Sequence, residues 1–167
     1  MTVEKENVVY FIKQSDYIKI GVSSNIRNRM NHYKTHSPYG FEEIAHFAYS
    51  SKSEMQNAEK WFHSLFWHYH HRGEWFWYKP IINWLYSTDE ERMWLIFKRV
   101  TLNEKLDIYD DSFRYFWLNC GYEFWRGDET ISESLHIIPT YCTDEQLERF
   151  EREDKEYEIE QSLSLAM

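Results

Sequence analysis

The chain has 167 residues, which is enough for one domain with its own core and an appendage. Its 8 Trp, 13 Tyr and 11 Phe stand against 5 Gly and 3 Pro, a composition that excludes a disordered chain. The formal net charge of -9 argues against a uniformly basic protein that coats nucleic acid.

The charge is unevenly distributed along the chain. Residues 1–86 contain 10 Lys and Arg against 8 Asp and Glu, whereas residues 87–167 contain 9 against 20, so the two parts carry +2 and -11. The first part also contains seven of the eight histidines. We therefore expect two regions: a domain over 1–86 that can face phosphate, and an acidic, aromatic-rich, mainly helical region over 87–167 that repels it.

Targeting signals and membrane segments are not predicted. No apolar run approaches the roughly 20 residues of a membrane span, and the first six residues lack the basic start and apolar stretch of a signal peptide. These features predict a cytoplasmic protein with no membrane partner. Cys120 and Cys142 suit that compartment as reduced thiols, although two cysteines leave one disulfide open.

The first half of the chain predicts alternating strands and helices. Residues 7–13 are rich in strand formers and residues 17–23 alternate in polarity, so with the polar turn between them they predict a hairpin. The following elements are expected in this order: a helix capped by Ser23, Ser24 or Asn25 and running to about Lys34, a third strand over 41–49, a helix from Ser51 or Ser53 that ends at Arg72-Gly73, an extended segment over 74–78 and a helix from Pro80 to Tyr86. The predicted class is α/β (α+β), with a small, three-stranded, largely antiparallel sheet flanked by helices.

The second half is harder to interpret. Residues 88–100 predict a capped helix that is acidic at its start and basic at its end, and the sequence from Thr143 is helix-forming and acidic. Between these helices, the aromatic clusters 113–117 and 122–125 alternate with acidic turns. Exposed aromatic clusters mark contact sites, so a protein partner or a homodimer through this region is expected.

Four short motifs carry a family resemblance. They are Val9-Tyr10-Phe11 on the first strand, Lys19-Ile20-Gly21 on the second, Arg29 eight residues after that glycine, and Ala58-Glu59 on the longer helix. Together they resemble the GIY-YIG nuclease superfamily. Residues 18–23, Glu59 with His63 four positions later, and Gly73-Glu-Trp-Phe76 are similar to the branch named after an open reading frame of phage T5. The resemblance covers roughly residues 8–78.

The resemblance implies a metal-dependent endonuclease that hydrolyses phosphodiester bonds of DNA, of phage or mobile-element origin. It assigns the first-motif tyrosine to Tyr10, the phosphate-binding arginine to Arg29 and the metal-binding carboxylate to Glu59, with Mg²⁺ or Mn²⁺ as cofactor. Lys19 stands where the wider superfamily has a second tyrosine, and it joins the catalytic set as a phosphate contact.

The chemistry of these side chains agrees with those roles. A hard divalent cation prefers carboxylate oxygen and often takes one or two protein ligands. A guanidinium at Arg29 suits a phosphoryl oxygen and the charge that grows in the transition state. Tyr10 is expected to orient the attacking water, or to accept its proton if its pKa falls well below about 10.

Further groups are expected to bind nucleic acid around this set. His32, Tyr33 and His36 follow Arg29 at three, four and seven positions, so they share one helical face. Arg27, near the start of the same helix, is also expected to bind nucleic acid. His63, one turn after Glu59, is expected to reach the water shell of the metal or a phosphate. Glu74 is a secondary candidate near the metal.

Structural roles compete with each assignment. Tyr10 also suits packing between strand and helix, while Lys19, Arg29 and Glu59 also suit ordinary solvated positions. A zinc site at residues 68–71 is not favoured, because tetrahedral ligand spacing is missing. The alternative function is a GIY-YIG-type protein with weak or no catalysis, which acts through protein binding or nucleic-acid mimicry by its acidic half.

Overall fold

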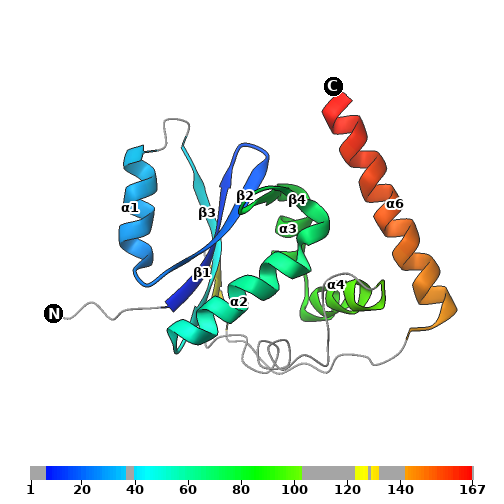
Figure 1. Ribbon diagram of the computed structural model, residues 1–167, viewed down its shortest axis with the longest axis horizontal. Helices are drawn as coiled ribbons and strands as arrows, with labels where there is room; N and C mark the ends of the chain where they lie inside the picture. Colours follow the sequence, from blue (N-terminus) through cyan, green and yellow to red (C-terminus); the bar gives the residue numbers. More distant parts are fainter. Residues whose placement is uncertain (1–6, 37–39, 103–122, 128, 132–141, 167) are drawn as a thin grey trace.

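The structure, a computed structural model, describes residues 7–36, 40–102, 123–127, 129–131 and 142–166. Figure 1 shows a central sheet with helices on its faces and a long helix at the C-terminal end. The elements are β1 (Asn7–Gln14), β2 (Tyr17–Ser23), α1 (Ile26–His36), β3 (Glu42–Tyr49), α2 (Lys52–Leu65), the 3-10 helix η1 (Trp67–Tyr69), β4 (His70–Arg72), β5 (Trp75–Trp77), α3 (Tyr78–Leu85), α4 (Asp89–Thr101), β6 (Glu123–Arg126), β7 (Glu129–Ile131) and α6 (Asp144–Ala166).

The sheet is larger than the three strands expected from the sequence. Within the described residues it has seven strands in the order β4-β5-β2-β1-β3-β6-β7, and all neighbouring strands pair antiparallel. The predicted strands β2, β1 and β3 form its centre. The prediction of three strands was wrong because β4, β5, β6 and β7 are three or four residues long, too short for periodicity to reveal, although β5 lies within the extended segment expected over 74–78.

The two faces of the central strands pack against different helices. On one face, α2 places Ala58, Phe62 and Leu65 against the apolar side chains of β1, β2 and β3. On the other face, Met30 of α1 packs against Tyr10 and Ile12. The sheet therefore has helices on both sides, with α1 beyond one face and α2 beyond the other (Figure 1).

Helix α2 ends earlier than expected. The sequence predicts one helix as far as Arg72, but α2 stops at Leu65 and the chain passes through η1 into β4. Gly73, with φ of 56°, turns the chain so that β4 can pair with β5. Strand β5 hydrogen-bonds to β2, and β4 hydrogen-bonds to β5, so these backbone groups find partners in the sheet. These bonds outweigh the helical spacing of the apolar residues in the sequence.

The region after residue 86 is partly built into the same sheet. Strand β6 pairs with β3, and Phe124 stacks on Phe47 with ring centroids 4.2 Å apart. The expected helices over 88–100 and from Thr143 correspond to α4 and α6. The aromatic cluster 113–117, as well as Tyr122 and Cys120, lies outside the described residues, while Cys142 is a free thiol.

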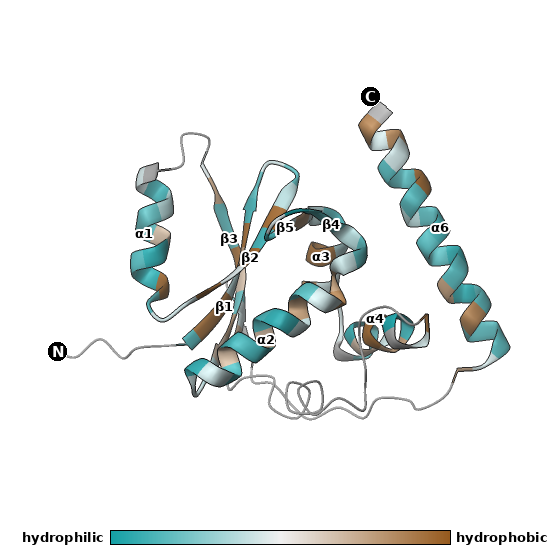
Figure 2. Ribbon diagram, viewed as in Figure 1, coloured by the Kyte–Doolittle hydropathy of each residue, from teal (hydrophilic) through white to brown (hydrophobic). Residues whose placement is uncertain are grey.

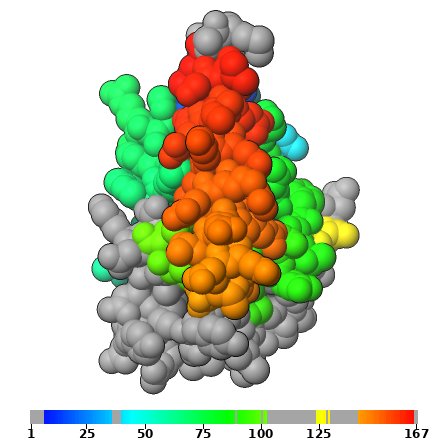
Figure 3. Space-filling model, turned by 90° about the vertical axis from the view of Figure 1, so that its right-hand side faces the viewer, coloured from blue at the N-terminus to red at the C-terminus, as the bar shows by residue number. Residues whose placement is uncertain are grey.

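Helix α6 is predominantly polar and lies across α4 (Figures 2 and 3). Phe150 is fully buried between Trp94 and Phe97, at centroid distances of 4.8 and 5.6 Å. The described helices include none with the length and apolar character that a bilayer span requires.

A buried charge cluster ties α6 to the body of the protein. Arg99 of α4 has 0% exposure and donates to Asp154 Oδ2 at 2.9 Å and to Tyr69 Oη at 2.8 Å. Lys98 Nζ lies 2.6 Å from Asp154 Oδ1. One carboxylate thus neutralises two cations that have left water, so Asp154 is the central residue of this contact.

Candidate active site

The site forms on the sheet face that carries α1. Side chains alternate along a strand, and Tyr10 of β1 pairs with Gly21 of β2, so Tyr10, Lys19 and Gly21 share this face. The polar ends of the Tyr10 and Lys19 side chains lie beside Tyr33 of α1.

Tyr10 and Gly21 fit together closely. A Cβ atom at Gly21 would lie 2.5 Å from Tyr10 Oη and 2.7 Å from its Cζ. Real Cβ contacts are not that short, so the Tyr10 ring occupies the space that a side chain at 21 would need. The Tyr and Gly of the two motifs are therefore a packing pair, and the glycine sets the position of the phenol.

We expect the substitution Gly21→Ala to displace the Tyr10 ring. Overpacking of a closed site costs about 1–3 kcal/mol of unfolding free energy, which urea denaturation would measure. In a Tyr10→Leu background the same substitution should cost much less, because the obstructing end of the ring is gone. Equal costs in the two backgrounds would show that the contact does not constrain position 21.

Tyr10 is buried and hydrogen-bonded as a neutral phenol. It is 2% exposed, and its Oη lies 3.1 Å from Tyr33 Oη on α1. Burial, and then the bond to Tyr33, raise the pKa of Tyr10 well above its ordinary value, although the nearby Arg29 opposes the shift. The option of Tyr10 as a proton acceptor needs a lowered pKa, so the geometry favours Tyr10 as a hydrogen-bonding group.

Lys19 connects the phenol pair to a carboxylate. Its Nζ lies 5.5 Å from the ring centre of Tyr33 and 3.6 Å from Glu74 Oε2. The backbone of Glu74 is held in place, because its carbonyl accepts a 3.1 Å hydrogen bond from Ile20 N. Lys19 is therefore oriented by an aromatic face on one side and an acid on the other.

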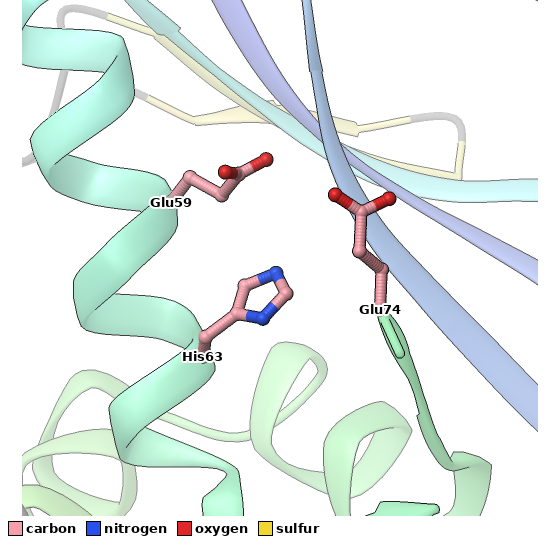
Figure 4. A group of neighbouring side chains, drawn as sticks. All are labelled: Glu59, His63 and Glu74. Carbon is pink, nitrogen blue, oxygen red and sulfur yellow. The ribbon is translucent and has the colours of Figure 1, made fainter. Parts of the chain in front are cut away.

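Glu59, His63 and Glu74 converge beside β2. Each offers one ligand atom, and these atoms lie within 4.8 Å of one another, with the three side chains directed into a common space (Figure 4). Burial, and then the charge of Glu74, raise the pKa of Glu59, while Lys19 lowers it. Two carboxylates that repel each other in a partly buried place are an arrangement that a cation stabilises.

His63 is already used within the fold. Its Nε2 lies 3.0 Å from the Ile20 carbonyl oxygen, and since a carbonyl only accepts, Nε2 donates. Burial lowers the pKa of His63, which favours the neutral ring. In this arrangement His63 fastens α2 to β2. Its expected contact with phosphate or with metal-bound water stays a prediction.

The donor set fits a hard divalent cation. Glu59 and Glu74 supply carboxylate oxygens, the ligands that Mg²⁺ and Mn²⁺ prefer, and few protein ligands are required because water and phosphate complete the shell. The Nε2 of His63 is hydrogen-bonded to the Ile20 carbonyl, so the carboxylates of Glu59 and Glu74 determine which metal the site prefers.

The other expected residues lie on α1 with different degrees of involvement. Arg29 is exposed, and its charge only partly opposes the rise in the pKa of Tyr10, while Tyr33 touches Tyr10 directly. Arg27 and His32 are exposed, and the His32 ring stands edge-on to Tyr33 at 6.2 Å. His36 is the last residue of α1, and its side chain lies outside the described part of the chain.

Glu74 is more central than the sequence suggested. From the sequence Glu74 is a secondary candidate, because the segment from Gly73 to Phe76 also suits a strand that closes the core. The pairing of Lys19 with Trp75 brings residue 74 next to Lys19 and to the end of α2. The Gly73-Glu pair, a turn between two aromatic strands, was the signal that could have identified it.

Fold and site together define a small α+β protein with a phenol, a lysine and paired carboxylates beside the central strands β1 and β2. The T5orf172 domain model matches residues 7–92, just over half of the chain. The chain therefore belongs to the T5orf172 domain family, whose fold is GIY-YIG-like and nuclease-associated. Comparison with curated proteins and with solved structures gives no significant match.

Proposed function

We propose that this protein is a metal-dependent endonuclease that hydrolyses phosphodiester bonds of DNA. The observation that carries the proposal is one connected set of side chains. Glu59 faces Glu74, Glu74 pairs with Lys19, Lys19 lies against Tyr33, and Tyr33 is bonded to Tyr10. Groups from four separate stretches of the chain, namely the β1–β2 hairpin, α1, α2 and the turn between β4 and β5, thus meet beside β2.

Each residue of this set has its own role in the proposed hydrolysis. Glu59 and Glu74 would hold Mg²⁺ or Mn²⁺, which supplies Lewis-acid stabilisation of charge on a phosphate oxygen. Arg29, exposed beside Tyr10, binds a phosphoryl oxygen and stabilises the negative charge of the transition state. Lys19 neutralises a second oxygen, and Tyr10, fixed by Tyr33, orients the water that adds across the P–O bond.

Plasmid nicking tests the proposal. Supercoiled DNA incubated with the protein should convert to the open circular form in Mg²⁺ or Mn²⁺ and remain supercoiled in excess EDTA. RNA and single-stranded DNA tested in parallel define the substrate class. If no nucleic acid is cut under any of these metals, the hydrolytic function is rejected.

A second candidate follows from α6. Glu145, Glu148, Glu151 and Glu156 of this helix are exposed, as are the apolar side chains of Ile159 and Leu163. An acidic helix with apolar positions suits docking on a basic protein or imitation of nucleic acid. DNA binding that weakens steeply with salt favours the first function, whereas binding only to protein favours the second.

A further inference from the structure

A groove opens beside the tip of the β1–β2 hairpin. It has a volume of about 620 Å³ and is lined by Gln14, Ser15, Tyr17, His71, Arg72 and Trp75. We call it the hairpin groove. None of the roles assigned above to Tyr10, Lys19, Arg29 or Glu59 uses it.

Flat rings form one wall of the hairpin groove. The His71 ring stacks on Tyr17 with centroids 4.2 Å apart and planes at 23°. Tyr17 also meets Trp77 edge-on at 6.1 Å, which holds its ring in place. His71 is exposed and Tyr17 is half-buried, so the stack ends in a face that a further ring can cover.

The lining of the hairpin groove is basic and polar. Arg72 and His71 are both exposed, and the remaining lining residues are Gln14, Ser15 and the two aromatic side chains. No carboxylate belongs to this lining among the described residues. Aromatic rings combined with a guanidinium suit an anionic ligand that carries flat rings, which describes a nucleotide strand.

The hairpin groove and the active site share one face of the sheet. Tyr17 and Lys19 are two residues apart on β2, and Gln14 and Trp75 pair with Tyr17 and Lys19. At about 3.3 Å per strand residue, Tyr17 lies about 7 Å from Lys19 and about 13 Å from Gly21. That second distance corresponds to about four stacked nucleotides at ~3.4 Å each.

We propose that the hairpin groove binds an unpaired base of the nucleic-acid strand whose phosphate occupies the active site. The base stacks on the Tyr17–His71 pair, and Arg72 contacts the adjoining backbone. This inference rests on the proposed nuclease function and adds to it a preference for substrates with single-stranded segments close to the cut. Stacking is tolerant of sequence, because every base offers a flat face.

Fluorescence polarisation tests the groove without cleavage. The parent protein is Glu59→Gln in Mg²⁺, and the probes are a fluorescein-labelled single-stranded DNA and the matching blunt duplex. We expect Tyr17→Ala to weaken single-strand binding by about 5- to 150-fold, with duplex binding changed less than about twofold. His71→Ala, at an exposed position that does not endanger folding, should weaken it in the same direction.

Two matched variants serve as controls. Tyr17→Phe keeps the ring and should bind like the parent, and Tyr86→Ala removes a 49% exposed ring outside the groove and should have no effect. If neither Tyr17→Ala nor His71→Ala weakens single-strand binding, the hairpin groove does not bind the base. The nuclease proposal is then unaffected. If the Glu59→Gln parent binds no oligonucleotide, the proposal of base binding in the hairpin groove is also rejected. The nuclease activity is tested separately, by plasmid nicking with the wild-type protein.

Discussion

Replacing Glu59 by Gln should reduce metal-dependent nicking by about 10²- to 10⁴-fold, the equivalent of several kcal/mol at 1.36 kcal/mol per factor of ten. The amide keeps the size of the side chain and loses the charge that would hold a cation. Since burial and Glu74 both disfavour the Glu59 carboxylate, the neutral side chain should leave the melting temperature equal or raise it. Nicking time courses and thermal melts measure both effects.

Glu90→Gln provides the matched control, because Glu90 is an exposed carboxylate on α4, a helix that supplies none of the site residues. It should cut at the wild-type rate. If Glu59→Gln cuts as fast as wild type, Glu59 has no part in catalysis. If activity is lost together with a large drop in melting temperature, the role of Glu59 is structural.

Replacing Asp154 by Ala should cost about 3 kcal/mol of unfolding free energy or more. The substitution leaves the fully buried Arg99 without its carboxylate, while Lys98 keeps Glu153 at 3.5 Å. A buried charge that loses its partner costs about 3–5 kcal/mol. The lower end applies because the Asp154 side chain is 16% exposed. Urea denaturation measures the change, and Glu156→Ala, an exposed acid on the same helix, should change stability by less than about 0.5 kcal/mol.

Acid should weaken the contact of Asp154 with Lys98 and Arg99. Burial alone raises the pKa of Asp154, but its bonds to Lys98 and Arg99 outweigh that effect and hold the pKa below its ordinary value. The stabilisation is therefore complete above the ordinary aspartate pKa of about 3.9 and is lost as the pH falls through the lower pKa of the folded protein. The stability difference between wild type and Asp154→Ala should shrink in that acid range; a difference that grows there would contradict the assignment.

The central hairpin, α1, α2 and β3 were predictable, because each is long enough to show its periodicity and carries a local start signal. Asn25 caps α1 by accepting from Asn28 N, and Ser51 caps α2 by accepting from Glu54 N. The short strands were not predictable in the same way. Residues 123–126 form β6 only because the β3 edge is available to them, and residues 70–72 form β4 only because β5 lies opposite.

Some features of the candidate site were likewise predictable from the sequence, and others were not. The motifs identified Tyr10, Lys19, Arg29 and Glu59, since each lies at a fixed place in a long element. The contact of Lys19 with Glu74 depends on the register between β2 and β5, which a three-residue strand does not reveal. The bond from His63 to the Ile20 carbonyl likewise depends on how α2 packs across the sheet edge.

A crystal soaked in Mn²⁺ and measured for anomalous scattering tests the central claim most directly. One strong peak is expected within ligand distance of the carboxylates of Glu59 and Glu74, and it should be absent from Glu59→Gln crystals soaked in the same way. An empty space between these two acids at saturating Mn²⁺, or a peak only at other carboxylates, would contradict the account.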